Sequence, residues 1–221
     1  MLVKSWMTTD VITIDEETSV MKASQLMKEN NVRRLPVMRK GQLVGIVSDR
    51  DLKEASPSKA TTLDVHELYY LLSELKVKDI MSSNVATVGP DETVEIAAVR
   101  MLENGISGLP VVEEGRLVGI LTQKDVFKVL ISITGIYRGG VQFAFNLSDR
   151  PGSIKEVADV IRAYGGSMVS ILSSYDSCEE GCRNVYIRID SLPEAKLKAL
   201  IAELEQNFIL IHVSKDQLKS V

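Results

Sequence analysis

The chain has 221 residues and a formal net charge of −4, with 26 Lys and Arg against 30 Asp and Glu. A chain of this length forms one large domain or two small ones. The acidic balance argues against a nucleic-acid-binding protein, which needs a basic surplus for phosphate backbones, and an aromatic content of only 5% argues against stacking platforms for single strands.

Sequence features also bear on the compartment. The N-terminus lacks the basic and apolar run of a signal peptide, and no uncharged apolar stretch reaches membrane-spanning length. The two cysteines, Cys178 and Cys182, do not make a disulfide framework. We therefore expect a protein of the reducing cytoplasm, with free thiols and no membrane partner.

An internal repeat organises the first part of the chain. Residues 3–52 align with residues 77–126 at a constant offset of 74 and without a gap. Two copies are too few for a solenoid and favour a pseudo-two-fold pair. The sequence thus predicts a first domain over 1–135, with repeats at about 3–54 and 77–131.

Each repeat predicts the element order β-α-β-β-α. It opens with a β-rich run, at 11–14 in the first copy and 85–88 in the second, followed by an amphipathic helix. A hairpin comes next, which in the first copy turns at Gly41, and a short helix begins near Asp49. The segment 55–76 between the repeats predicts a helical insert.

A different unit is predicted over 136–221. Its periodicities indicate strands at 141–146, 168–174, 184–189 and 208–213, with helices starting at Ser153 and Pro193. The order β-α-β-β-α-β is that of a ferredoxin-like fold. We expect parallel central strands, whose open face a second copy of the domain would cover. The fold class of the whole chain is α+β.

Each repeat carries a Ser/Thr-x-x-Asp motif where a strand leads into a helix, and a cation inside that motif. From the residues alone, the motif is consistent with a capping box that has no function beyond stability. A carboxylate at such a junction also suits the hydroxyls of a ribose, and a helix N-terminus offers N–H groups to a phosphate. The two runs are Ser48-Asp49-Arg50-Asp51 and Thr122-Gln123-Lys124-Asp125.

The repeats resemble CBS (cystathionine-β-synthase) motifs, paired as in a Bateman module. The resemblance rests on Leu35-Pro36-Val37 with Gly45–Asp51, and on Leu109-Pro110-Val111 with Gly119–Asp125. It implies a non-catalytic regulatory protein that binds AMP, ADP, ATP or S-adenosylmethionine in two clefts and requires no other cofactor. The implied cleft residues are Thr13, Arg33, Arg34, Ser48, Asp49, Arg50 and Asp51 in the first repeat, and Thr87, Ser107, Gly108, Thr122, Lys124 and Asp125 in the second.

The two clefts are expected to differ. Ser107 and Gly108 leave room for a purine, whereas Arg33 and Arg34 at the corresponding positions fill space and add charge. An arginine fork matches phosphate geometry, so the Arg pair is a candidate for a phosphate tail. The alternative for this pair is two solvated arginines at a strand end.

The last unit resembles an ACT domain, on the runs Asp149–Ile154 and Tyr164–Met168. The resemblance implies a homodimer and a small metabolite such as an amino acid. Many amino-acid-binding ACT domains carry Asn where Ser167 stands, so a unit that only dimerises remains the alternative. The implied contact residues are Asp149, Gly152, Ser153, Ile154 and Ser167.

The combination of a CBS pair with an ACT unit resembles the AcuB group of acetoin-utilisation proteins. It implies a role in regulating acetoin or acetate metabolism through an unidentified protein target. Two other functions stay open: an interaction scaffold with vestigial clefts, and a nucleotide hydrolase that uses Asp49, Asp51 and a metal. The sequence shows no catalytic constellation, metal-ligand spacing or P-loop in support of the hydrolase.

Overall fold

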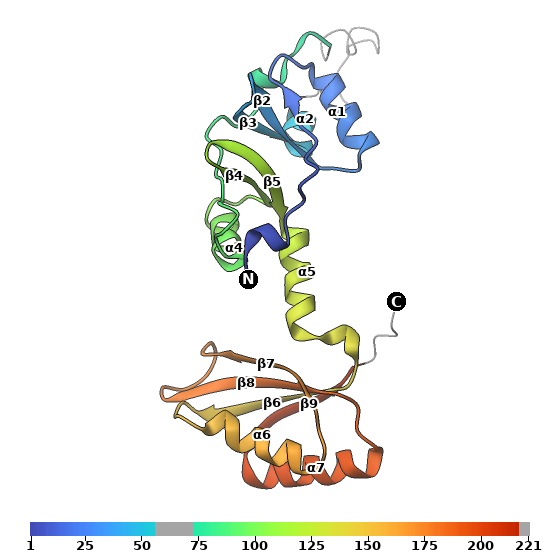
Figure 1. Cartoon of the computed structure of the whole chain (residues 1–221), viewed down its shortest axis with the longest axis vertical. Helices are drawn as coiled ribbons and strands as arrows, with labels where there is room; N and C mark the ends of the chain where they lie inside the picture. The colour runs from blue at the N-terminus through green and yellow to red at the C-terminus, as the bar shows by residue number, and fades with distance from the viewer. Residues whose placement is uncertain (56–72, 217–221) are drawn as a thin grey trace. The chain divides into compact units, whose positions relative to one another are not determined.

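The computed structural model describes residues 1–55 and 73–216 (Figure 1). The chain divides into two compact units, Met1–Val126 and Phe127–Val221. Their boundary lies inside helix α5 (Gln123–Thr134), a few residues before the predicted boundary at 135. The helical insert predicted for 55–76 falls largely outside the described residues.

Each repeat of the first unit has its own small sheet, β1-β2-β3 in the first copy and β4-β5 in the second. The predicted order of helices and hairpins is confirmed. The first repeat contains η1 (Val3–Ser5), β1 (Ile14–Asp15), α1 (Val20–Glu29), β2 (Arg34–Arg39), β3 (Gln42–Ser48) and α2 (Asp49–Glu54). The second contains η2 (Val77–Asp79), α4 (Val94–Glu103), β4 (Gly108–Glu113), β5 (Arg116–Thr122) and the start of α5.

The buried positions recur at the offset of 74, so the sequence repeat is a structural repeat. Apolar residues at helical spacing on α1 and α4 pack against alternate residues of the strands, as their periodicity predicts. Serine and threonine N-caps start both helices: the Ser19 Oγ accepts from the Lys22 N–H and the Thr93 Oγ1 from the Ile96 N–H. The buried pairs are Val3/Val77, Ile14/Val88, Val20/Val94, Ala23/Ala97, Met27/Met101, Leu35/Leu109, Val37/Val111 and Val47/Leu121.

The β-rich runs that open the repeats form less strand than predicted. Only Ile14–Asp15 becomes β1, parallel to β2, and Val88 makes a single parallel bridge with Val111. The preceding segments pair with the opposite repeat instead. Thr8 exchanges two backbone hydrogen bonds of 2.9 Å with Ile120 of β5, and Ser82 exchanges two of 3.0 Å with Ile46 of β3.

Two glycines permit this crossing. A Cβ built on Gly45 would lie 2.3 Å from the Met81 Sδ, and one on Gly119 would lie 2.5 Å from the Met7 Sδ. Each methionine precedes a crossing segment and belongs to the repeat opposite its glycine. The repeated Gly therefore lets the leading segment of one repeat lie close against the strand of the other.

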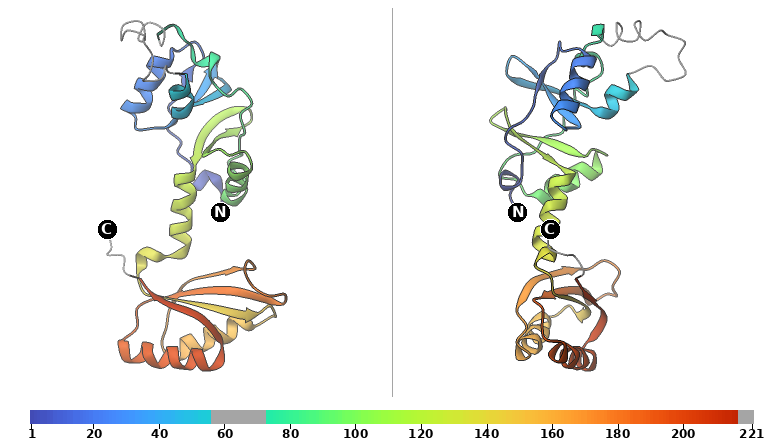
Figure 2. Two further views of the ribbon diagram at one scale, coloured as in Figure 1. Left: turned by 180° about the vertical axis from the view of Figure 1, so that it is seen from behind. Right: turned by 90° about the vertical axis from the view of Figure 1, so that its right-hand side faces the viewer.

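The second unit is a four-stranded sheet in the order β7-β8-β6-β9, with both helices on one face (Figures 1 and 2). Every neighbouring pair is antiparallel, so the predicted parallel central strands are wrong. The strands joined by α6 run the same way, but β8 inserts between them. The elements are β6 (Val141–Ser148), α6 (Ser153–Ala163), β7 (Met168–Ser174), β8 (Cys182–Ile189), α7 (Glu194–Asn207) and β9 (Ile209–Lys215), preceded by η3 (Ile136–Arg138).

The core of this unit lies between the sheet and its helices, where Phe143 and Phe145 are fully buried. On the other face, the end of α5 packs on the sheet. The carbonyl of Thr134 accepts from the Ser170 hydroxyl at 2.9 Å and from the guanidinium of Arg188. Arg188 is buried and also forms a bidentate ion pair with Asp216. These contacts explain why the last turns of α5 belong to the second unit.

Candidate functional site

The Ser48–Asp51 motif forms the predicted capping box at the start of α2. The Asp51 Oδ2 accepts from the Ser48 N–H at 2.7 Å and from the Ser48 hydroxyl at 2.8 Å. These bonds fix the carboxylate at the strand-to-helix junction. The other carboxylate oxygen, Oδ1, has no hydrogen-bond partner among the described residues. The capping role and a binding role are thus compatible, because they use different oxygens.

The second repeat has the same local geometry. The Asp125 Oδ2 accepts from the Thr122 N–H at 3.0 Å and from the Thr122 hydroxyl at 2.6 Å. Asp125 is only 4% exposed, whereas Asp51 is partly exposed. Lys124, the cation inside this motif, is exposed. The matched geometry follows from the matched sequence, and the two carboxylates differ in their access to solvent.

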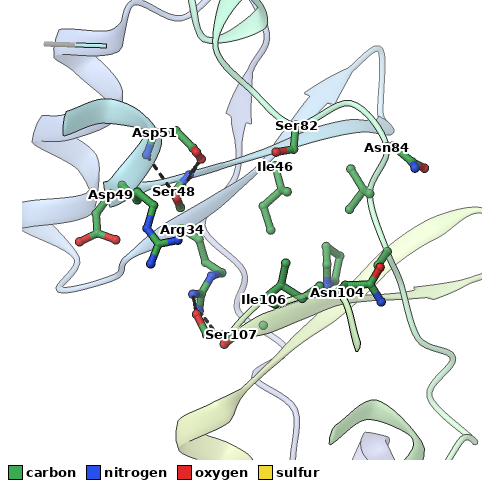
Figure 3. A pocket seen from close by; sticks show the side chains of 16 residues that line it. Arg34, Ile46, Ser48, Asp49, Asp51, Ser82, Asn84, Asn104, Ile106 and Ser107 are labelled. Carbon is green, nitrogen blue, oxygen red and sulfur yellow. Dashed lines mark hydrogen bonds between the residues drawn. The ribbon is translucent and has the colours of Figure 1, made fainter. Parts of the chain in front are cut away.

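A cavity of about 340 Å³ opens beside Ser48 and Asp51, within the first unit (Figure 3). Small-molecule sites begin at about 300 Å³, so the space suits a compact ligand. Both repeats form its walls, and Ser82 of the second repeat pairs with Ile46 of β3 in the first. The first repeat contributes Arg34, Ile46, Ser48, Asp49, Arg50 and Asp51, and the second contributes Ser82, Asn84, Val85, Ala86, Asn104, Gly105, Ile106, Ser107, Gly108 and Pro110.

Arg34 connects the two walls. Figure 3 shows its side chain reaching from β2 of the first repeat to Ser107 of the second. Its Nη1 donates to the Ser107 carbonyl at 2.9 Å, and its Nη2 donates to the Ser107 hydroxyl. A Cβ on Gly108 would lie 2.9 Å from the Arg34 Nη1, so this glycine makes room for the guanidinium. Burial lowers the pKa of Arg34, and the nearby Asp49 carboxylate opposes that change.

The structure groups the predicted cleft residues differently from the repeats. Ser107 and Gly108, expected with the second motif, line the same cavity as the first motif. The remaining six expected residues do not line this cavity. They are Thr13 and Arg33 of the first repeat, and Thr87, Thr122, Lys124 and Asp125 of the second.

Arg33 lies instead beside a second cavity of about 480 Å³. This cavity is formed by residues of α1 and α2 with the turn between α1 and β2, and Asp49 lines both cavities. Successive side chains of an extended chain point to opposite faces. The two neighbouring arginines therefore line different cavities, and only Arg34 reaches the cavity beside Ser48 and Asp51.

Several cavity residues were not predicted from the sequence, among them Ser82, Asn84, Asn104 and Ile106. They lie on the crossing segment and on the turn that follows α4. The cavity that they line is shared with first-repeat residues, and Ser82 pairs with Ile46 of the first repeat, which local periodicity does not reveal. The one available signal was the repeated Gly45 and Gly119, each a sign that another backbone approaches closely.

The residues expected at the C-terminal site fall into two places. Asp149, Gly152, Ser153 and Ile154 precede or open α6, whereas Ser167 follows it. Because α6 has 11 residues and a helix rises 1.5 Å per residue, about 16 Å separates its ends. Within one chain, Ser167 is therefore not brought to the loop before α6.

Arg183 joins the loop before α6, and sequence reasoning missed it. Its Nη2 donates to the Ser153 hydroxyl at 3.2 Å, and its Nε lies 3.6 Å from the Asp149 Oδ1. The Nε is buried and makes no hydrogen bond within the described residues. Arg183 was missed because it lies on a strand that is distant in sequence, and only the register Leu147↔Arg183 places it beside this loop.

Other kinds of site find no support in the described residues. No group of three or more His, Cys, Asp or Glu side chains is placed there to hold a metal ion. None of the helices in that part of the chain combines the length and apolarity needed to span a bilayer.

Comparison with known proteins identifies the first unit. The CBS domain family matches residues 3–58 and 77–132, which together make up just over half of the chain. The chain belongs to the CBS domain family. The matched segments coincide with the structural repeats, so the cavity beside Ser48 and Asp51 is formed by a CBS domain pair.

Two solved CBS proteins are similar to this chain. The CBS domain pair of protein MJ0100, solved with 5′-methylthioadenosine and S-adenosyl-L-methionine, matches 59% of this chain and 95% of its own at 30% identity, with a TM-score of 0.50. A Vibrio cholerae protein assigned as the acetoin utilization protein AcuB matches 62% of this chain and 94% of its own at 28% identity, with a TM-score of 0.51.

Some curated relatives match this chain over only part of a longer sequence. An inosine-5′-monophosphate dehydrogenase of Korarchaeum cryptofilum is 40% identical over 125 residues, which are 56% of this chain and 23% of that enzyme. The chain spans less than a quarter of the length of the first two curated relatives it matches. The similarity therefore concerns only a part of those enzymes, and their activities are not carried over to this chain.

Proposed function

We propose that this chain is a non-catalytic regulatory sensor whose CBS pair binds an adenosine-containing ligand in the cavity beside Ser48 and Asp51. The observation that carries the proposal is the Asp51 carboxylate at the edge of a cavity walled by both repeats, where Ser48 holds one oxygen and no described residue hydrogen-bonds the other. Such a carboxylate accepts hydrogen bonds from the two vicinal hydroxyls of a ribose.

The rest of the cavity suits the other parts of an adenosine ligand. Ile46, Val85, Ala86, Ile106 and Pro110 supply apolar surface for a purine ring. The polar residues Ser82, Asn84 and Asn104 also line the cavity and offer groups that can hydrogen-bond a base edge. The solved pair of protein MJ0100, with its two adenosine-derived ligands, supports the same ligand class.

The charged part of the ligand would meet Arg34 and Arg50. Two nitrogens of Arg34 donate to Ser107, a neutral residue, and Arg50 is exposed at the cavity edge. A phosphate of AMP, ADP or ATP, or the carboxylate of S-adenosylmethionine, is a stronger acceptor than Ser107. Arg33 and the second motif, with Thr13, Thr87, Thr122, Lys124 and Asp125, remain candidates for a separate cleft.

Regulation follows from the way the cavity is built. A ligand that touches both repeats binds most tightly to one arrangement of them and shifts the population toward it. The response is transmitted to a protein target, and the likeness to AcuB of Vibrio cholerae supports a setting in acetoin or acetate metabolism. We place this sensor in the cytoplasm.

For the second unit, we propose an ACT-like role in dimerisation and in sensing a small metabolite. Its antiparallel sheet with two helices on one face supports this assignment. Asp149, Gly152, Ser153 and Ile154, with Arg183, would contact a metabolite such as an amino acid. Ser167 would take part only if a second copy of the chain brought it to the loop.

A ligand screen by thermal unfolding tests the proposed function. We expect AMP, ADP, ATP, S-adenosylmethionine or 5′-methylthioadenosine to raise the unfolding temperature of the full chain. A ligand present at 100 times its Kd stabilises the folded state by about 2.7 kcal/mol. If no adenosine compound stabilises the chain at millimolar concentration, the clefts are vestigial and the scaffold function replaces the sensor. Release of phosphate from ATP would favour the hydrolase.

A homodimer is part of this proposal, and helix α4 supports it. Ile96, Val99 and Leu102 form an exposed apolar stripe on α4, with Leu102 78% exposed. At the offset of 74, helix α1 carries Lys22, Gln25 and Lys28 at these positions. The two helices are equivalent elements of the two repeats, and α1 folds with polar residues at these positions. The apolar stripe of α4 is therefore not needed for folding and is available to a second copy of the chain.

Introducing a charge into this stripe tests the dimer. We expect Leu102→Lys to weaken the dimer, because a buried unpaired ammonium costs several kcal/mol at an apolar contact. Light scattering coupled to size exclusion reports the mass. Gln25→Lys, on the corresponding face of α1, is the matched control and should keep the wild-type mass. A Leu102→Lys protein that also keeps it would exclude α4 from the interface.

A further inference from the structure

Both cysteines of the chain lie in or beside one short loop. Cys178 is within the segment 175–181, which joins β7 to β8, and Cys182 is the first residue of β8. Both thiols are free and half-buried, so small reagents can reach them. The proposed adenosine site uses neither residue.

The loop folds Cys178 back onto Cys182. The Cys178 Sγ lies 3.2 Å from the Cys182 carbonyl oxygen and 3.1 Å from the Tyr175 carbonyl oxygen. A turn closed by the Cys182 N–H and the Glu179 carbonyl, at 3.1 Å, shortens the path between the two cysteines. Positive φ angles at Ser177 (59°) and Gly181 (80°) wind the chain into this compact form.

The loop also lies on the side of the sheet where the Cys182 side chain stands. Cys182 and Asn184 are two residues apart on β8, so their side chains share one face. The Asn184 Nδ2 donates to the Asp176 carbonyl at 3.2 Å, which ties the loop to that face. The Cys178 thiol thus lies against the main chain of Cys182, in a loop tied to the face that carries the Cys182 side chain, and a disulfide needs such proximity.

We propose that Cys178 and Cys182 form a reversible intramolecular disulfide by exchange with a low-molecular-mass disulfide. One thiolate attacks a sulfur of the small disulfide, forms a mixed disulfide and releases one small thiol. The second protein thiolate then attacks the protein sulfur of that bond and expels the other small thiol. The protein loses two protons and two electrons, and these appear in the two small thiols.

The position of the pair connects its redox state to the loop before α6. The Gly181 carbonyl accepts from the Asp149 N–H at 2.8 Å. The Tyr175 hydroxyl, on the same loop, lies 3.5 Å from the Asp149 Oδ1. A disulfide would draw the Cys178 sulfur away from its two carbonyl partners. This movement would begin at Cys182, next to Gly181, and the Gly181 carbonyl holds the Asp149 segment in place.

Intact-mass analysis after oxidation tests the pair. The full chain is incubated with excess glutathione disulfide under native conditions, quenched in acid and treated with an alkylating reagent. We expect the wild-type chain to lose the mass of two hydrogens, to carry no glutathione and to take up no alkyl group. Reduction with dithiothreitol should restore two alkylation sites. Cys178→Ser and Cys182→Ser should each stop at one bound glutathione.

Three results would overturn the proposal. The wild-type chain could carry two glutathiones, which means that both thiols react but cannot reach one another. It could retain two alkylation sites under conditions in which the single-serine variants are modified. It could instead form disulfide-linked dimers visible in non-reducing mass analysis. Each result is independent of adenosine binding, so failure of this proposal leaves the proposed sensor function untouched.

Discussion

Replacing Asp51 by Asn is expected to weaken binding of the adenosine ligand about 100-fold. The substitution keeps the size of the side chain but removes the charge that strengthens its bonds to ribose hydroxyls. Hydrogen bonds to charged groups contribute about 1.5–3 kcal/mol each, and a 100-fold change corresponds to about 2.7 kcal/mol. Because the Asp51 Oδ1 accepts no hydrogen bond from any residue that the structure describes, most of the loss should appear in binding. Calorimetric titration measures it.

The same substitution disturbs the capping box of α2, so a control for stability is needed. Thr93→Ala removes the N-cap of α4, a hydroxyl that accepts from the Ile96 N–H. It should cost a similar amount of unfolding free energy, about 1 kcal/mol, and Thr93 does not line the cavity. We expect Thr93→Ala to bind the ligand as the wild type does. Equal affinity of Asp51→Asn and the wild type would remove Asp51 from the site.

Gly45→Ala should lower the free energy of unfolding of the first unit by about 1–3 kcal/mol, the usual range for overpacking. The new methyl group would lie 2.3 Å from the Met81 Sδ and 2.9 Å from its Cγ. Met81 immediately precedes the crossing segment, so the strain acts on the contact between repeats. Urea unfolding followed by circular dichroism measures the change.

Two variants separate this clash from a general effect of replacing glycine. A Cβ at Gly89 would meet its neighbours at 3.5 Å, an ordinary contact, and Gly89 has no positive φ. Gly89→Ala should therefore change stability by less than about 0.5 kcal/mol. Adding Met81→Ala to Gly45→Ala should cost less than the two single changes together. If Gly45→Ala and Gly89→Ala are equally stable, the repeats do not pack as described.

Much of the fold could be predicted because the spacing of apolar residues along the chain indicates which side chains form the core. The buried pairs such as Leu35/Leu109 and Val37/Val111 repeat at the offset of 74 and alternate as strand residues should. Partner choice between strands is different, since it depends on contacts far apart in sequence. Thr8 and Ser82 each pair with a strand of the opposite repeat, and the runs at 11–14 and 85–88 do not predict this pairing.

The candidate site was predicted in part for the same reason. Ser48 and Asp51 were found because a capping box and a ribose site need the same residue types at the same spacing. Arg34 was separated from Arg33 only by the structure, in which strand alternation sends the two side chains to different cavities. Ser107 was expected in another cleft, because nothing local indicates that it accepts hydrogen bonds from Arg34.

One titration tests most directly the central claim that a single adenosine site is built from both CBS repeats. The ligand that stabilises the wild-type chain is titrated into two variants, Ser48→Ala in the first repeat and Ala86→Leu in the second. Ser48 positions the carboxylate and Ala86 lines the opposite wall. We predict that each variant alone weakens the same binding event at least about tenfold, or 1.4 kcal/mol. Wild-type affinity in Ala86→Leu would contradict a shared cavity.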